Sequence, residues 1–317
     1  MKKYITKRKE STNSVSCDTL NQLVFLDPAV ARKSKIVDDT LSNSEGWPLP
    51  SVVEISESGT CNRVCSFCPR SAPDYPDVKE FIKQALLKKL VAELGELSYE
   101  GIFIFSGFVE PMLDKNIYQH IGISRQHMPK AKIEMVTNGD VLTPNRLLKL
   151  FDSGLSTLLI SVYDGPEDAE RFKHMYESVN LTDEKVVIRH RYLPESENFG
   201  ITINNRAGMM ANATYSIPTP IEPLRAPCNY PHYTFFMDYQ GDVLLCPHDW
   251  GKKLVVANLN HSSFREAWLG KILVKARERL SQSDRGFKPC SSCDVHGSLI
   301  GNDHVVAWEK HLKVFKK

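Results

Sequence analysis

From residue 51 onward, the hydrophobic and polar positions of the chain follow two alternating patterns, one typical of strands and one typical of helices. Short apolar runs of strand length recur, and segments with apolar residues three or four positions apart lie between them. The runs that predict strands are SVVEIS (51–56), GIFIFS (101–106), KIEMVT (132–137), STLLISVY (156–163), KVVIRHRY (185–192) and, as a further candidate, GITIN (200–204). The segments that predict helices are 78–97, 114–126, 143–154 and 165–177.

Strands that alternate with helices in this way predict right-handed crossovers and a parallel sheet. The number of units favours an α/β fold in which residues 51–209 form a partial (β/α)6 TIM-like barrel, with a doubly wound open sheet as the alternative. The helix at 143–154 has the clearest ends: Thr143 suits the N-cap, Pro144 the first helical position, and Gly154 follows the last turn.

The rhythm changes after about residue 210. YTFFMDYQGDVLL (233–245) predicts two short strands that meet at a Gln-Gly turn. An amphipathic helix over about 262–280 and the loop PCSSC (289–293) follow. We therefore expect a small C-terminal domain over 210–317, built from a hairpin and a helix. Residues 1–50 are polar with little pattern and predict an N-terminal extension.

Composition limits the classes of partner and the compartment. The 317 residues carry 40 basic and 38 acidic side chains, a net charge of +2, which gives no electrostatic reason to expect a nucleic acid or a membrane as partner. The start of the chain lacks the apolar stretch of a secretory signal, and no run is long enough to span a bilayer. We expect a cytoplasmic protein, in which clustered cysteines bind metal more often than they form disulfides.

The cysteines fall into two groups. Three form a C-x3-C-x2-C pattern within SGTCNRVCSFCPRS, namely Cys61, Cys65 and Cys68; four lie in the C-terminal region, namely Cys228, Cys246, Cys290 and Cys293. Four cysteines can complete a tetrahedral zinc site or ligate an iron–sulfur cluster fully. Three cysteines leave one iron of a four-iron cluster without a protein ligand, and the alternative is a zinc site completed by a histidine. Cys17 is left over as an incidental thiol.

The segment CNRVCSFC, placed directly after the first strand, resembles the signature of the radical S-adenosylmethionine (SAM) enzymes, including the aromatic Phe67 before the third cysteine. The resemblance covers about 51–205 and implies that Cys61, Cys65 and Cys68 hold a 4Fe–4S cluster. It also implies that SAM chelates the open iron and is cleaved reductively to a 5′-deoxyadenosyl radical, which abstracts hydrogen from a substrate.

Further residues match the family's SAM-binding motifs. SGFVEP resembles a Gly-Gly-Glu-type motif in which Ser106 replaces the first glycine, so the resemblance implies that Ser106 and Gly107 contact SAM and that Glu110 supports them. Other candidates near strand ends are Asn138, Ser161 and the barrel-facing Glu54. Each of these also has an ordinary structural interpretation, as a turn, a core hydroxyl or a loop residue.

The C-terminal region, from APCNYPHYTFF to PCSSC, resembles the twitch domain, a shortened SPASM domain with one auxiliary 4Fe–4S cluster. This resemblance implies that Cys228, Cys246, Cys290 and Cys293 ligate that cluster and that it accepts an electron. A four-cysteine zinc ribbon is the alternative. His248 is expected to lie beside the site or at the surface, since four cysteines already suffice.

The combined resemblance, close to the aminocyclitol dehydrogenase type, implies oxidation of a small polar substrate such as a sugar or cyclitol. A flavodoxin or ferredoxin is the expected electron donor. The candidate substrate-facing residues are Arg206, Tyr163, Arg189 and Arg191. Arg206 is expected to orient the substrate, because a guanidinium is too basic to act as the catalytic base. The alternatives are a radical SAM enzyme that modifies peptides and a zinc-binding protein without enzymatic activity.

Overall fold

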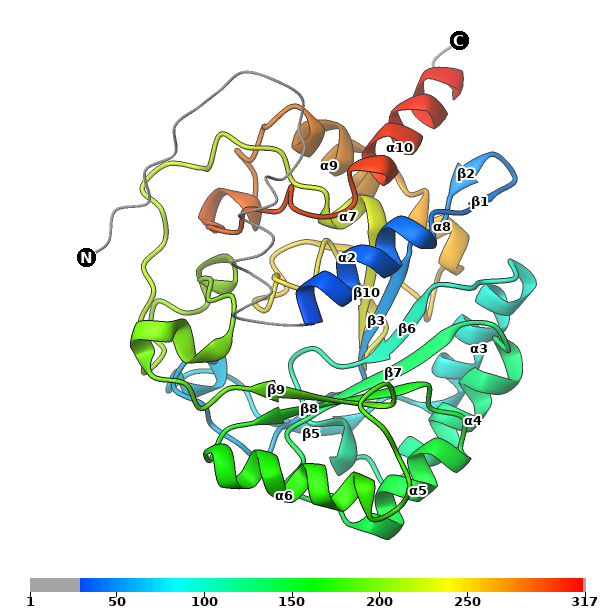
Figure 1. The fold of residues 1–317 in the computed structure, drawn as a ribbon. Helices are drawn as coiled ribbons and strands as arrows, with labels where there is room; N and C mark the ends of the chain where they lie inside the picture. Colours follow the sequence, from blue (N-terminus) through cyan, green and yellow to red (C-terminus); the bar gives the residue numbers. More distant parts are fainter. Residues whose placement is uncertain (1–28, 316–317) are drawn as a thin grey trace.

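The structure is a computed structural model that describes residues 29–315. One curved sheet of eight strands runs through it in the order β12-β11-β10-β3-β6-β7-β8-β9 (Figure 1). The strands are β3 (Val52–Ser56), β6 (Ile102–Phe105), β7 (Lys132–Thr137), β8 (Thr157–Val162), β9 (Val186–His190), β10 (Thr234–Asp238), β11 (Asp242–Leu244) and β12 (Val255–Asn258). All pairs from β10 to β9 are parallel, and β11 and β12 are antiparallel additions. This α/β sheet is the expected partial barrel.

Four helices cover the outer face of the sheet (Figure 1), and they are α3 (Gln84–Glu96), α4 (Ile117–His127), α5 (Pro144–Asp152) and α6 (Pro166–Glu177). Helix α5 begins where the sequence predicts, because the Thr143 side chain accepts a hydrogen bond from the Arg146 amide at 3.3 Å. It ends before Gly154, whose φ of +105° suits a glycine.

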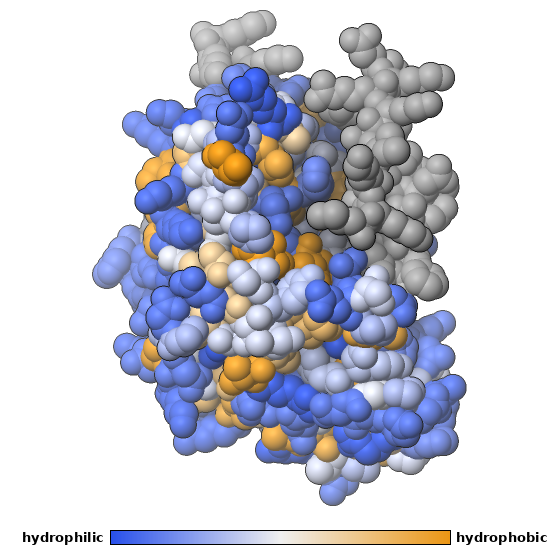
Figure 2. All heavy atoms as spheres, turned by 90° about the vertical axis from the view of Figure 1, so that its left-hand side faces the viewer, coloured by the Kyte–Doolittle hydropathy of each residue, from blue (hydrophilic) through white to orange (hydrophobic). Residues whose placement is uncertain are grey.

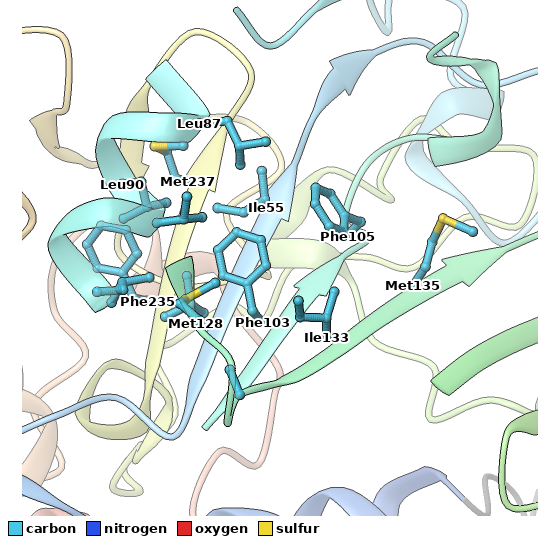
Figure 3. Close-up of a cluster of buried hydrophobic side chains, with 14 of the residues drawn as sticks. Ile55, Leu87, Leu90, Phe103, Phe105, Met128, Ile133, Met135, Phe235 and Met237 are labelled. Atoms are coloured by element: carbon cyan, nitrogen blue, oxygen red, sulfur yellow. The ribbon is translucent and has the colours of Figure 1, made fainter. Parts of the chain in front are cut away.

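The main core lies between the outer face of the sheet and these helices (Figure 3). Alternate side chains of β3 and β6, such as Ile55 and Phe103, pack there against Leu87 and Leu90 of α3. The intervening positions of the strands face the inside of the barrel and include polar side chains. The alternation therefore separates a hydrophobic outer face from an inner face that is available for chemistry.

The inner face is partly covered by α2 (Ala29–Asp39), which crosses it in Figure 1. Ile36 and Val37 of this helix pack against Val52 and Ile102 near the beginnings of their strands. The Arg32 guanidinium also hydrogen-bonds the carboxylate of Glu134, which is buried. A short hairpin of β1 (Asn43–Ser44) and β2 (Trp47–Pro48) follows. In its described part, the segment before residue 51 is thus integrated into the fold, a packing that its weak hydrophobic pattern did not predict.

Three sequence predictions of secondary structure are wrong. Residues 78–81 form a strand, β5 (Val78–Phe81), which pairs with β4 (Ser58–Gly59), so the helix predicted from residue 78 begins only at Gln84. Residues 200–204 form no strand, and the sixth parallel strand is β10, which pairs with β3. The helix expected over 262–280 is broken at Gly270 into α8 (Phe264–Trp268) and α9 (Lys271–Ser281).

The remaining elements of the described residues are two helices and five short 3-10 turns, and they lie in both halves of the chain. They are α7 (Tyr230–Tyr233), α10 (Asn302–Phe315) and the short 3-10 turns η1 (Pro69–Ser71), η2 (Pro111–Leu113), η3 (Glu195–Gly200), η4 (Arg206–Gly208) and η5 (Cys290–Ser292). Helix α10 was not predicted. The predicted boundary at 209/210 lies between η4 and α7, and the sheet continues across it through β10.

Hydrophilic residues dominate the face of the molecule shown in Figure 2, and hydrophobic residues appear there as small separate patches. None of the helices within residues 29–315 has the length and apolar character needed to cross a bilayer.

Candidate active site

The three cysteines of the C-x3-C-x2-C pattern lie on one loop that follows β3 and β4. The loop folds back on itself through a hydrogen bond from the Cys68 amide to the Cys65 carbonyl at 3.0 Å. Cys61, Cys65 and Cys68 are all free thiols and partly buried. The structure therefore brings the three predicted ligands together near the C-terminal end of β3, where barrel enzymes place their active sites.

The electrostatics of this loop fit a cationic iron centre. Burial raises the pKa of Cys65 to about 12, and the neighbouring Cys68 and Cys61 add to the effect. Burial likewise raises the pKa of Cys61 and of Cys68. Thiolates that are desolvated and repel one another need bound positive charge, which iron would supply.

Polar side chains fasten the cysteine loop to neighbouring strands. Asn62 donates to the Asp140 carboxylate at 2.7 Å and accepts from the Asn138 amide group at 2.8 Å. Arg63 forms ion pairs with Asp140 and Asp164, which follow β7 and β8. The loop is thus held against the C-terminal edge of the sheet. Sequence reasoning missed Asn62, although its position directly after the first cysteine marked it as part of the loop.

Glu110 holds the ends of β6 and β7 together from within the protein. Its side chain is 2% exposed and accepts hydrogen bonds from the Met112 amide at 3.0 Å, the Thr137 hydroxyl at 2.6 Å and the Asn138 amide at 2.7 Å. Burial raises the pKa of Glu110 to about 7, although these three donors oppose the shift. Because both carboxylate oxygens are engaged, Glu110 shapes the loops and presents no free oxygen to a ligand.

Asn138 is similarly committed to the protein. Its side chain donates to Asn62 and accepts from the Asp140 amide at 3.0 Å. Both polar atoms of the side chain therefore already have partners, so a ligand at the end of β7 would meet backbone groups first. The structure places Asn138 where the sequence predicts and assigns its side chain a positioning role.

Ser106 and Gly107 lie at the end of β6. The Ser106 hydroxyl donates to the Glu54 carboxylate at 2.6 Å, so both residues point to the inner face of the barrel. Gly107 has a φ of +95°, and a Cβ there would lie 2.9 Å from the Ser56 side chain. Only glycine fits this position without strain. Because it has no side chain, its backbone lies close to the space inside the barrel.

A cleft of about 390 Å³ opens beside the cysteine loop. Its lining residues are Arg63, Val64, Cys65, Phe67, Tyr163, Arg191, Tyr192, Leu193 and Phe199. The Phe67 ring stacks on Tyr163 with centroids 6.1 Å apart and packs against Phe199 at 4.9 Å. A cleft of this volume with aromatic walls suits a ligand of the size of SAM, next to one of the three thiols.

The residues near the ends of β8 and β9 line the same region. Tyr163 hydrogen-bonds with the Ser161 side chain, and burial raises its pKa above the usual tyrosine range. Arg189 is opposite Ser161 in the pairing of the strands, so the two side chains share the inner face. Arg191 is buried and donates to the carbonyl of Gly200, so it braces the loop that forms a wall of the cleft.

Arg206 lies between the two cysteine groups. It begins the turn η4 with a φ of +47°, and its Nη1 lies 3.3 Å from Nδ1 of His248. Because the guanidinium donates, His248 accepts at Nδ1 in its neutral form, and burial with the nearby Arg206 charge lowers the pKa of His248. Burial raises the pKa of Cys68, and the Arg206 charge opposes this rise. His248 is thus a buried partner of Arg206 rather than a surface residue.

The four C-terminal cysteines surround one largely enclosed cavity. Cys228, Cys246, Cys290 and Cys293 all line it. Burial raises the pKa of each of these thiols. A Cβ on Gly297 would lie 2.3 Å from the Cys228 sulfur, so a glycine is required there.

The donor set around this cavity fits an iron–sulfur cluster with four cysteine ligands, because four free thiols without a disulfide face the same enclosed space. Within residues 29–315, no three His, Cys, Asp or Glu side chains come close enough together to bind one metal ion. Cys17 lies outside the described residues.

Sequence reasoning also missed two residues beside the cavity. Tyr230 lines it and contacts the His248 ring edge-on, with centroids 4.8 Å apart. Arg285 lines it as a buried cation. The only sequence signal for Arg285 was its place in the segment DRGFKPC, shortly before Cys290.

The fold and the two cysteine sites agree with the family models that match this sequence. The radical SAM superfamily model matches residues 55–198, and the SPASM iron–sulfur cluster-binding domain matches residues 228–294. The chain therefore carries a radical SAM domain followed by a SPASM-type domain. It is a radical SAM oxidoreductase that uses SAM, a 4Fe–4S cluster and an auxiliary iron–sulfur cluster.

One curated protein and one solved structure are similar to this chain over most of their length. The S-adenosyl-L-methionine-dependent 2-deoxy-scyllo-inosamine dehydrogenase of Niallia circulans is 26% identical over 245 residues, which is 77% of this chain and 92% of the relative. The crystal structure of BtrN in complex with AdoMet and 2-DOIA has a TM-score of 0.67 at 26% identity and covers 81% of this chain and 97% of BtrN.

A more distant structure shows the fold alone. SuiB of Streptococcus suis bound to the precursor peptide SuiA has a TM-score of 0.55 at 13% identity, and it covers 93% of this chain and 78% of SuiB. At this identity the likeness carries no information on the substrate.

Proposed function

We propose that this enzyme oxidises a hydroxyl group of a small cyclitol-like substrate, and that the two cysteine groups hold two separate clusters. The observation that carries the proposal is the second group: four thiols enclose their own cavity, and Arg206 lies between that cavity and the three-cysteine loop. The likeness to the inosamine dehydrogenase over most of both chains supports the substrate class.

In this proposal Cys61, Cys65 and Cys68 ligate the SAM-binding cluster, and Cys228, Cys246, Cys290 and Cys293 ligate the auxiliary one. When bound, these groups supply a 5′-deoxyadenosyl radical and an electron acceptor, so that a carbinol carbon can lose a hydrogen atom, a proton and an electron to become a carbonyl. The aromatic cleft at Phe67 and the backbone at Gly107 hold SAM.

Arg206 orients the substrate between the two sites. Its hydrogen bond to His248 and the ring of Trp250, 5.7 Å away, fix the direction of the guanidinium. A guanidinium does not give up its proton at neutral pH, so the substrate proton passes to another group or to water. Tyr163, Arg189 and Arg191 line the same side of the site and complete its polar wall.

The first 50 residues bear on the choice between a small molecule and a peptide. In the described part of this segment, residues 29–48 form one helix and a two-stranded hairpin that pack on the barrel. This arrangement offers no separate peptide-binding domain there and supports a small substrate. We further propose that the enzyme works in the cytoplasm with a flavodoxin or ferredoxin as reductant.

The test uses anaerobically reconstituted enzyme with 2-deoxy-scyllo-inosamine as the probe. The triple variant Cys61→Ala/Cys65→Ala/Cys68→Ala should form no 5′-deoxyadenosine. Cys290→Ser/Cys293→Ser should retain cleavage of SAM but lose the oxidised product, with Cys17→Ser as the matched thiol control. Ketone formation by the Cys290→Ser/Cys293→Ser variant would refute the electron-acceptor role, and turnover of only a peptide would refute the substrate class.

Arg206→Lys and Arg206→Gln test the positioning role. Both variants should bind SAM normally and lose product formation by about 100-fold or more, because a displaced substrate no longer meets the radical in a reactive geometry. Unchanged kinetics in Arg206→Gln would show that Arg206 does not contact the substrate.

A further inference from the structure

The cavity of the four C-terminal cysteines has one buried cation in its wall. Arg285 is 2% exposed and lines this cavity. Its guanidinium donates to the Val295 carbonyl at 2.7 Å and to the carbonyls of Ala226 and Pro227 at 2.9 Å each. Pro227 directly precedes Cys228, and Val295 follows Cys293 by two residues. Arg285 therefore joins the two segments that carry these cysteines.

The charge of Arg285 has no carboxylate counterion. All three of its hydrogen bonds go to backbone carbonyls, and no ion pair with Arg285 occurs among residues 29–315. Two carboxylates of the same region are engaged elsewhere: Asp249 accepts from the amides of Lys253 and Leu254, and Asp294 accepts from the Asn205 amide.

A buried charge of this kind needs an opposite charge nearby. Backbone carbonyls accept three hydrogen bonds from the guanidinium, but a full positive charge removed from water is unfavourable unless a negative partner compensates it. The four thiolates of a cluster in the adjacent cavity are such a partner, since an iron–sulfur cluster with four cysteine ligands carries a net negative charge.

We propose that Arg285 is the counterion of the auxiliary cluster and raises its reduction potential. The proposal rests on the proposed function, in which the four cysteines hold that cluster. Reduction adds one negative charge to the cluster, so a fixed cation at the cavity wall stabilises the reduced form more than the oxidised form.

This role makes Arg285 a positioning and tuning residue for the oxidation. The substrate radical loses one electron and one proton to become a carbonyl, and the cluster gains the electron. Arg285 supplies no proton and touches neither substrate nor SAM in this scheme. Its effect is to make the transfer of that electron more favourable.

A purely mechanical role is the competing explanation, since Arg285 also clamps two loops. Two substitutions separate charge from clamping. Arg285→Gln removes the charge, whereas Arg285→Lys keeps a positive charge but cannot form the planar set of three hydrogen bonds. Arg279 provides a charge control, because it lies near the end of α9, is partly exposed and pairs with Asp284 at 2.5 Å.

The experiment is a potentiometric titration of the reconstituted enzyme in the presence of SAM, followed by electron paramagnetic resonance of the auxiliary cluster. In Arg285→Gln, the ratio of reduced to oxidised cluster at a fixed potential should fall at least tenfold, a midpoint shift of about −59 mV for one electron. In Arg285→Lys this ratio should fall less than tenfold. In Arg279→Gln it should fall less than in Arg285→Gln, because the Arg279 charge is partly exposed and already paired with Asp284.

Iron content and circular dichroism are measured alongside to confirm that each variant is folded and holds both clusters. An unchanged midpoint in Arg285→Gln, or an equal fall in Arg285→Gln and Arg285→Lys, would overturn the counterion role. If Arg285→Gln does not retain the auxiliary cluster, the measurement on Arg285→Lys alone tests the proposal. A tenfold or greater fall in its ratio of reduced to oxidised cluster would then overturn the counterion role. A wild-type enzyme that binds only one cluster would instead refute the proposed function and the inference with it.

Discussion

The substitution Glu110→Gln tests how the strand ends around the SAM site are held together. Glu110 accepts three hydrogen bonds, two at one carboxylate oxygen and one at the other. Glutamine keeps one oxygen and turns an NH2 group toward the remaining donor. In the better orientation, the oxygen serves Met112 and Thr137, and the NH2 group faces the Asn138 amide. One buried N–H is then left without an acceptor, at a cost of about 1–3 kcal/mol.

The pH dependence of this substitution has a definite sign. Burial raises the pKa of Glu110 from 4.5 to about 7 in the folded protein. Between these values the folded state holds a proton that the unfolded state has released, so the free energy of unfolding of the wild type falls as pH rises. A difference of about 2.5 pH units corresponds to about 3 kcal/mol, of which about 2–3 kcal/mol is lost between pH 5 and pH 8.

Glutamine does not titrate, so Glu110→Gln should be destabilising at pH 5 and close to the wild type at pH 8. The assay is urea-induced unfolding of both proteins across this range, with the exposed Glu170→Gln on α6 as control. The free energy of unfolding of the wild type minus that of Glu110→Gln should decrease by about 2–3 kcal/mol from pH 5 to pH 8. The corresponding difference for Glu170→Gln should stay constant. A Glu110→Gln difference that is constant with pH, or that grows toward pH 8, would refute the raised pKa.

The remaining predictions concern three other contacts of the barrel. Arg32→Met should lower the free energy of unfolding by about 2–3 kcal/mol in urea titrations, because it leaves the buried Glu134 without its cation, and the added Glu134→Met substitution should restore most of the loss. Gly107→Ala should weaken SAM binding in equilibrium dialysis and cost about 1–3 kcal/mol of stability, since φ is +95° and the new Cβ would lie 2.9 Å from its nearest neighbour. Ser106→Gly should cost about 1 kcal/mol in thermal unfolding, because Glu54 loses a donor at 2.6 Å.

Local patterns predict those elements of the fold whose signals lie within one segment. Helix α5 has its cap, its first-turn proline and its terminal glycine within twelve residues, and the structure confirms all three. Strand β10 has the same apolar character as the other strands, but its partner β3 is far away in the sequence. Periodicity identifies a strand and contains no information on its neighbour, so the sixth parallel strand was placed at 200–204 instead of 234–238.

Helix α2 in the N-terminal segment also could not be predicted from local pattern. Helix α2 buries only a few apolar side chains, among them Ile36 and Val37, and the rest of its surface is polar. Its sequence alone gives little reason to expect order. The helix is stabilised by contacts that only the folded barrel provides, including the ion pair of Arg32 with Glu134.

Residue identity predicts where the site lies better than what each side chain does there. Glu110 and Asn138 lie at the strand ends as expected, yet their polar atoms bind the protein itself. The sequence shows only that such groups are available. Whether a carboxylate faces a ligand or a neighbouring amide depends on loop geometry, and that geometry is set by residues from other strands, such as Thr137 for Glu110.

The pairing of β10 with β3 places the two cysteine groups near opposite ends of two neighbouring strands. The three-cysteine loop follows the end of β3, whereas Cys228 precedes the start of β10, which runs parallel beside it. A strand of five residues spans about 16 Å, so the two sites are separated by about one strand length along the inner face of the barrel. Arg206 lies within this interval and contacts His248 near Cys246, while its charge acts on Cys68. Insertions that lengthen β3 and β10 together would separate the sites and should slow product formation more than SAM cleavage.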